Sequence, residues 1–145
     1  MIALDTNLLI YAHRSDSEFH TESRMLVESL AGGGEAWAIP WPCAHEFLAV
    51  VTNPRIFKTP TPLAAALAEV RGLHDDSGAV FLAEGAGYLD GLESLASVAR
   101  VQGGAIHDAR VAAICLFHGV RELWSADRDF SRFPTLRARN PLVET

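Results

Sequence analysis

The sequence predicts an α/β fold, a three-layer α/β/α sandwich with a mainly parallel sheet. Short apolar runs of strand length alternate along the chain with longer segments of helical period. The first run, Ile2–Leu4, is followed at once by polar residues and then by a second apolar segment, as when a buried strand leads into a helix. The length of 145 residues, without a linker or repeat, suits a single domain over 1–145.

Breaking residues and periodicity place the elements. Gly32–Gly34 ends a helix, Pro40 stops a strand, and Pro60 with Pro62 excludes a regular element from the loop before residue 63. Asn7 or Thr6 is expected to cap the first helix. The expected strands are Ile2–Leu4, Ala36–Ile39, Ala79–Ala83, Glu122–Trp124 and Leu136–Ala138. The expected later helices are Phe19–Leu30, Pro42–Thr52, Leu63–Leu73, Leu89–Val101 and Ala109–Phe117.

Composition argues against several classes of protein. Hydrophobic residues make up 49% of the chain, which argues against disorder, and no apolar run approaches the ~20 residues that cross a bilayer. The N-terminus lacks the basic region of a signal peptide, so we expect a cytoplasmic protein with no membrane partner. Cys43 and Cys115 lie far apart and read as small buried hydrophobes. The histidines form no metal-ligand pair at helical spacing.

The net charge of −6 argues against a protein that coats nucleic acid. It does not exclude an enzyme that acts on nucleic acid, because clustered carboxylates add negative charge that divalent cations offset. Arginines crowd near the C-terminus and could hold phosphates bidentately, although a solvated face is the common alternative. They are Arg128, Arg132, Arg137 and Arg139.

Four acidic residues are candidates for chemistry. Asp5 and Asp127 each follow a short apolar strand, and ligands of open α/β sheets collect beyond the carboxyl ends of the strands. Asp108 opens the most hydrophobic helix of the chain. Glu46 is expected on the apolar side of its helix, beside Cys43, where an unpaired charge is costly.

Each acid also has an ordinary structural alternative. Asp5 could cap a helix, Asp108 could interact with a helix dipole, and Asp127 could close a turn. Asp129 is a fifth candidate two residues later. Carboxylates brought together need compensation, and a site of oxygen ligands alone suits Mg²⁺ or Mn²⁺. Such ions can clamp a phosphodiester and activate water.

Several short motifs, in their order and spacing, resemble the PIN domain. These are Asp-Thr-Asn at 5–7, Glu46 on a helix, His-Asp-Ala at 107–109, and Leu-Trp-Ser-Ala-Asp-Arg-Asp-Phe at 123–130. The tail Phe-Pro-Thr-Leu-Arg-Ala-Arg-Asn-Pro-Leu at 133–142 is similar to that of the VapC toxins of type II toxin–antitoxin systems. The resemblance covers essentially the whole chain.

The resemblance implies a Mg²⁺- or Mn²⁺-dependent ribonuclease with Asp5, Glu46, Asp108 and Asp127 as its acidic site. Asp5, Asp108 and Asp127 would hold the cation, with Asp127 favoured over Asp129 as the last acid. Glu46 would bind a second cation or orient the attacking water, and both roles stay open. Thr6 and Ser125 match flanking hydroxyl positions, with serine where threonine is usual. Arg128 and Arg132 are candidate contacts to RNA.

The same resemblance implies a homodimer and a VapB antitoxin whose C-terminal segment blocks the site. Two alternatives remain from the sequence: a catalytically silent partner-binding module of the same fold, and a housekeeping nuclease without a toxin role. A phosphatase with Asp5 as its nucleophile would want a second aspartate where this chain has Asn7. The sequence does not indicate which RNA would be cut.

Overall fold

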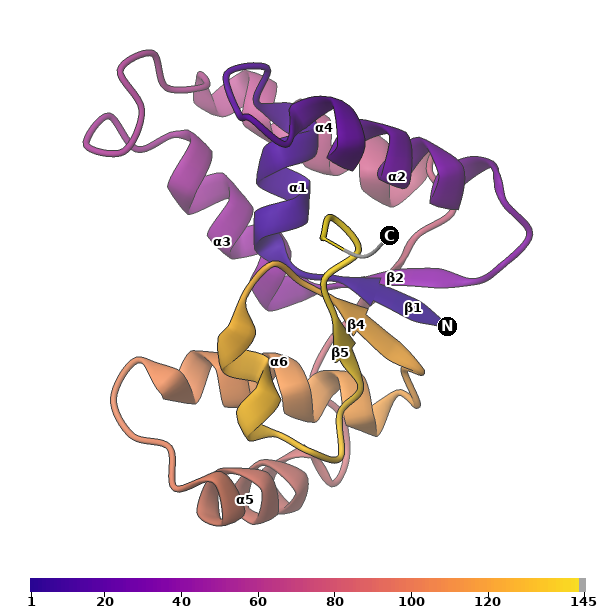
Figure 1. Cartoon of the computed structure of the whole chain (residues 1–145), viewed down its shortest axis with the longest axis vertical. Coiled ribbons are helices and arrows are strands. Elements are labelled where there is room, and N and C mark those ends of the chain that lie inside the picture. The colour runs from indigo at the N-terminus through magenta and orange to yellow at the C-terminus, as the bar shows by residue number, and fades with distance from the viewer. Residues whose placement is uncertain (144–145) are drawn as a thin grey trace.

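The computed structural model describes residues 1–143 as alternating strands and helices (Figure 1). The strands are β1 (Ile2–Leu4), β2 (Trp37–Pro40), β3 (Val80–Leu82), β4 (Glu122–Trp124) and β5 (Ala138–Arg139). The helices are α1 (Thr6–His13), α2 (His20–Gly32), α3 (Trp41–Val51), α4 (Leu63–Asp75), α5 (Tyr88–Ala99), α6 (Ala105–Phe117) and the 3-10 helix η1 (Arg128–Arg132).

The five strands form one sheet in the order β3-β2-β1-β4-β5, and all four pairings are parallel. Figure 1 shows α1, α2 and α4 on one side of the strands and α5 with α6 on the other. The predicted α/β sandwich is confirmed. Every residue of β1 and of β2 is buried, as expected for central strands of a parallel sheet covered on both faces.

The central strand β1 lies between β2 and β4, so the chain leaves it in one direction first and returns to its other side much later. The connection through α1 and α2 leads to β2, whereas β4 is reached only after α5 and α6. This reversal makes the carboxyl ends of β1 and β4 a topological switch point, where open α/β sheets bind ligands. Asp5 and Ser125 are the first residues beyond those two ends.

Two elements differ most in their bounds from the prediction. The helix expected from Ala109 begins at Ala105; its first turn has no buried residue, so the apolar pattern did not mark it. The last strand is Ala138–Arg139 rather than Leu136–Ala138, because Leu136 closes a turn by donating its N–H to the carbonyl of Phe133. Among residues 1–143, no helix is long and apolar enough to cross a membrane.

Candidate active site

Asp5 lies at the carboxyl end of β1 and is buried, with 7% of its surface exposed. It occupies the position before α1, but its carboxylate makes no capping bond to that helix. Instead Oδ2 accepts a hydrogen bond from the hydroxyl of Ser125 at 2.7 Å, and Oδ1 accepts a weak one from the thiol of Cys43 at 3.4 Å. The alternative in which Asp5 only caps the helix is therefore wrong, although Asp5 does stand at the N-cap position of α1.

Ser125 connects the two strand ends. Its hydroxyl donates to Asp5 and accepts the backbone N–H of Asp127 at 2.9 Å, so the loop after β4 is held against the loop after β1. Asn7 reinforces the connection. Its amide nitrogen lies 3.4 Å from both Asp5 Oδ2 and Ser125 Oγ, and its carbonyl oxygen accepts the N–H of Ala126 at 3.1 Å.

The expected capping of α1 by Asn7 or Thr6 was also wrong. Neither side chain makes a capping bond to that helix. The buried Thr6 hydroxyl donates to the carbonyl of Cys43 at 3.5 Å, which ties the start of α1 to the start of α3. Thr6 thus contacts the neighbouring helix, and the Asn7 side chain contacts the loop after β4.

Three carboxylates converge beside this network. Asp108 in the first turn of α6, Asp127 before η1 and Asp129 within η1 place one oxygen each within 4.8 Å of one another. We call these three residues the acidic trio. Asp127 also caps η1, because its Oδ1 accepts the N–H of Asp129 at 2.8 Å. The turn interpretation of Asp127 is thus confirmed, and it coexists with membership of the trio.

Glu46 differs from its prediction. The buried face of α3 consists of Cys43, Ala44, Phe47 and Val51, whereas Glu46 is exposed. Compared with the predicted orientation, α3 is turned about its axis so that the small residue Ala44 packs inward. The periodicity of apolar residues does not by itself fix this orientation. Glu46 lies outside the trio but within electrostatic reach of Asp5 and Asp108.

Burial and mutual repulsion disfavour the charged forms of these acids. Burial raises the pKa of Asp5 against the opposing effect of the Ser125 hydrogen bond. The pKa of Asp108 is raised by partial burial and then by the charge of Asp127. Desolvation, followed by the charges of Asp5 and Asp108, raises the pKa of Glu46. Carboxylates in this state favour a bound cation, which compensates their charge.

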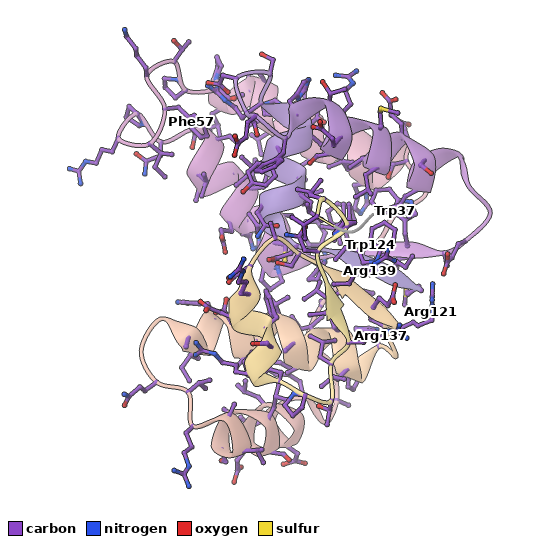
Figure 2. The ribbon with its side chains drawn as sticks, in the orientation of Figure 1. Trp37, Phe57, Arg121, Trp124, Arg137 and Arg139 are labelled. Atoms are coloured by element: carbon purple, nitrogen blue, oxygen red, sulfur yellow. The ribbon has the colours of Figure 1, made fainter. Side chains whose placement is uncertain are left out.

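The arginines near the C-terminus divide into two groups. Arg128 and Arg132 belong to η1, and a guanidinium nitrogen of Arg132 lies 3.8 Å from Asp129 Oδ1. Arg137 and Arg139 instead form ion pairs with the buried Glu122 at 3.2 and 3.7 Å (Figure 2). Their shared partner stands at the start of β4, so these two arginines stabilise the pairing of β4 with β5.

Sequence reasoning missed two contributors to the site. Cys43 was read as a small hydrophobe, and it is fully buried and free, but its thiol contacts Asp5. Asn7 was read as a helix cap, although it bridges two loops that lie 119 residues apart in sequence. The polar Asn7 directly after a strand end was the one available signal; nothing in the pattern marks Cys43.

The chain is similar to known proteins in sequence and in fold. The family model described as PIN domain matches residues 2–136. Ribonuclease VapC43 of Mycobacterium tuberculosis is 39% identical over 142 residues, covering 98% of this chain and 96% of that protein. The chain belongs to the VapC family of PIN-domain proteins. The resemblance inferred from the short motifs is therefore confirmed over nearly the full length.

Two solved structures share the fold of this VapC-family protein. VapBC2 from Rickettsia felis, bound to a DNA fragment from its promoter, matches with a TM-score of 0.68 at 16% identity, covering 97% of this chain and 98% of that one. VapC20 of M. tuberculosis, a sarcin-ricin loop cleaving toxin, matches with a TM-score of 0.66 at 16% identity, covering 90% and 93%. At this identity the likeness concerns the fold alone.

Proposed function

We propose that this protein is a divalent-cation-dependent ribonuclease that acts as the toxin of a VapBC system. The observation that carries the proposal is the acidic trio, which lies near Asp5 at the switch point of the sheet. The chain is also 39% identical to a protein named ribonuclease VapC43. The reaction is hydrolysis of an RNA phosphodiester. We also propose that residues 1–145 form a single domain.

The donors suit a hard cation. Asp108 and Asp127 offer oxygens within 4.8 Å of each other, and the trio contains neither thiolate nor imidazole, which favours Mg²⁺ or Mn²⁺ over zinc. We assign Asp108 and Asp127 as principal ligands, with Asp5 beside them and Asp129 as the supporting acid. When bound, the cation would supply Lewis acidity toward the phosphate.

The remaining polar groups would position the Asp5 carboxylate, accept a proton or contact the RNA backbone. Ser125 and Asn7 fix the orientation of the Asp5 carboxylate, while Thr6 holds α1 against α3. Glu46 lies outside the trio, is accessible and has a raised pKa, three properties that suit a proton acceptor for the attacking water. Arg128 and Arg132 would contact phosphates that flank the cleaved bond.

The partner assignments follow from the family. VapBC2 from Rickettsia felis is a solved complex of the same fold, and we propose a VapB-type antitoxin whose C-terminal segment covers the acidic site. We also propose a homodimer, which light scattering of the purified chain tests. We also propose that the protein works in the cytoplasm, where its RNA substrate would be found.

One experiment tests the function directly. The wild-type chain and Asp5→Asn are induced in matched bacterial cultures, growth is followed, and new RNA 5′ ends are sequenced. We expect growth arrest and discrete new ends with the wild type only, and relief when the antitoxin is co-expressed. Equal RNA ends in both cultures would overturn the ribonuclease proposal and leave a silent binding module. Cleavage without growth arrest would instead favour a housekeeping nuclease.

A further inference from the structure

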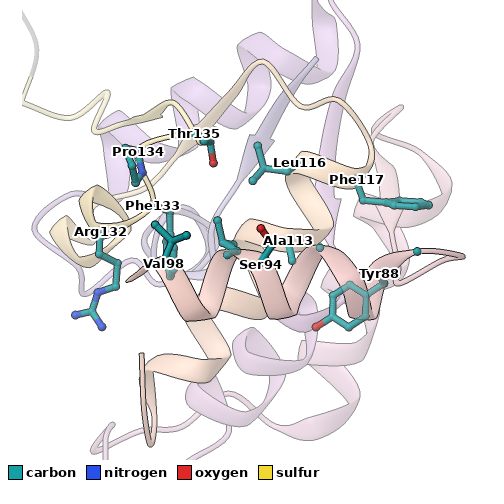
Figure 3. A pocket seen from close by; sticks show the side chains of 13 residues that line it. Tyr88, Ser94, Val98, Ala113, Leu116, Phe117, Arg132, Phe133, Pro134 and Thr135 are labelled. Atoms are coloured by element: carbon teal, nitrogen blue, oxygen red, sulfur yellow. The ribbon is translucent and has the colours of Figure 1, made fainter. Parts of the chain in front are cut away.

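A cavity of about 360 Å³ lies between α5, α6 and the segment that follows η1 (Figure 3). Leu95 and Val98 of α5 and Leu116 of α6 give it apolar walls, and the aromatic ring of Phe117 stands at one end. Polar groups are few and spread around these walls. They come from Tyr88, Ser94, Arg132 and Thr135.

The cavity adjoins the acidic trio. Arg132 lines it, and the guanidinium of the same residue lies 3.8 Å from Asp129. The lining residue Ala113 belongs to α6, the helix whose first turn carries Asp108.

We propose that this cavity receives one unstacked base of the RNA strand, next to the phosphate held at the acidic trio. The inference rests on the proposed ribonuclease function and adds a base-binding subsite to it. Single-stranded RNA is recognised by stacking splayed bases on aromatic rings and guanidinium planes and by hydrogen bonds to their edges. Apolar walls with a few hydroxyl groups and one arginine supply that combination.

Charge favours an RNA base over an apolar peptide segment as the occupant. The chain carries a net charge of −6, so an anionic strand gains attraction only where cations gather. Arg132 stands between the cavity and the trio, where it can neutralise the phosphate that joins the bound base to the cleaved bond. A purely apolar side chain would gain nothing from a guanidinium at this position.

Gly91 gives a way to fill the cavity without disturbing the fold. It lines the cavity from within α5, and a Cβ built on it meets no atom within 4 Å. Glycine inside a helix is less favourable than residues with a side chain, so a larger residue suits the backbone. Gly72 in α4 is the matched control, since its added Cβ also meets nothing and it does not line the cavity.

The test compares purified wild type, Gly91→Leu and Gly72→Leu on a randomised RNA pool with Mn²⁺, followed by end sequencing and by kcat/KM on the preferred oligonucleotide. We expect Gly91→Leu to lower kcat/KM by about tenfold or more and to flatten the base preference at one position beside the cut, since stacking of one base contributes about 1–3 kcal/mol. Gly72→Leu should match the wild type in both readouts.

Each other outcome overturns the subsite. Unchanged preference and kcat/KM in Gly91→Leu would remove it and leave the ribonuclease proposal intact, whereas a wild type that cuts no RNA would remove both. If Gly91→Leu keeps its RNA kinetics but loses co-purification with the antitoxin, or changes its mass by light scattering, the cavity is a protein-docking site instead. Ser94→Trp, which fills the same cavity from one turn further along α5, serves as the second variant.

Discussion

Asp5 shows what a single residue contributes at this site. It is buried, and the bonds from Ser125 and Cys43 do not fully offset the loss of water, because its pKa remains raised. The charged form of Asp5 thus destabilises the metal-free fold at neutral pH. A carboxylate at this position costs stability that a bound cation would restore.

We expect Asp5→Asn to lose at least about a hundredfold in RNA cleavage while matching or exceeding the stability of the wild type at neutral pH. Because the pKa of Asp5 is higher in the folded chain than in the unfolded chain, its protonated form stabilises the fold. This stabilisation is complete below the unfolded-state pKa and is lost as the pH rises through the raised, folded-state pKa. The advantage of Asp5→Asn should therefore grow from pH 4 to pH 7 in chelator. Thermal melts check this, with the exposed Asp76→Asn as control; a constant deficit at every pH would contradict it.

Asn7 gives a second test at the same scale. Removing its amide in Asn7→Ala leaves the N–H of Ala126 and the Asp5–Ser125 pair without a bridge, at a cost of about 1 kcal/mol in unfolding free energy. Cleavage should fall severalfold, because the loop that carries Asp127 loses its anchor. Asn53→Ala is the control, since Asn53 accepts the N–H of Arg55 in a remote loop. Equal cleavage in the two variants would refute a positioning role for Asn7.

At the scale of elements, the sequence predicted the order and type of the strands and of α1–α6, because the apolar runs and Gly or Pro breaks are local signals. It failed where tertiary contacts decide. The rotation of α3, which exposes Glu46, and the placement of β5, which pairs only two residues with β4, depend on neighbours distant in sequence. The short helix η1 carries too few residues to show a period.

Glu122 is an acidic residue with a structural role that lies outside the candidate site. It is buried at the start of β4, where it accepts a hydrogen bond from the indole of Trp124 at 3.1 Å and pairs with Arg137 and Arg139. We expect Glu122→Ala to lower the unfolding free energy by about 1–3 kcal/mol and to leave cleavage unchanged below the melting transition. Urea denaturation with a parallel activity assay measures both quantities.

The control for this variant is Glu35→Ala, which removes an exposed ion pair with Arg121 and should cost little. The low pKa of Glu122 is set first by the Trp124 hydrogen bond, so its stabilising effect is present above the unfolded pKa and is lost as the pH falls through the folded pKa. A loss of cleavage in a fully folded Glu122→Ala would contradict the division between structural and site acids.

At the scale of the molecule, the candidate site is assembled by topology. Asp5 and Ser125 are 120 residues apart, and only the insertion of β1 between β2 and β4 brings them into contact. Because both residues follow parallel strands, whose carboxyl ends share one edge of the sheet, the sequence was enough to predict that Asp5 and Asp127 would lie near each other. It could not predict that Asp129 joins Asp108 and Asp127, because that depends on the turn of η1.

For the molecule as a whole, the proposed cation site predicts that the stability of the fold depends on divalent cations. An ion that binds only the folded chain stabilises it by about 2.7 kcal/mol at a hundred times its dissociation constant, which corresponds to a rise of roughly 5–10 °C in Tm for a chain of this size. We expect Mn²⁺ or Mg²⁺ to raise the Tm of the wild type, EDTA to reverse the shift and stop cleavage, and the double variant Asp108→Asn with Asp127→Asn to show little shift.

Glu46→Gln should keep the shift and lose cleavage if Glu46 accepts a proton rather than binding the ion. An unshifted wild type would remove the cation from the proposal, and a Glu46→Gln variant without the shift would make Glu46 a ligand.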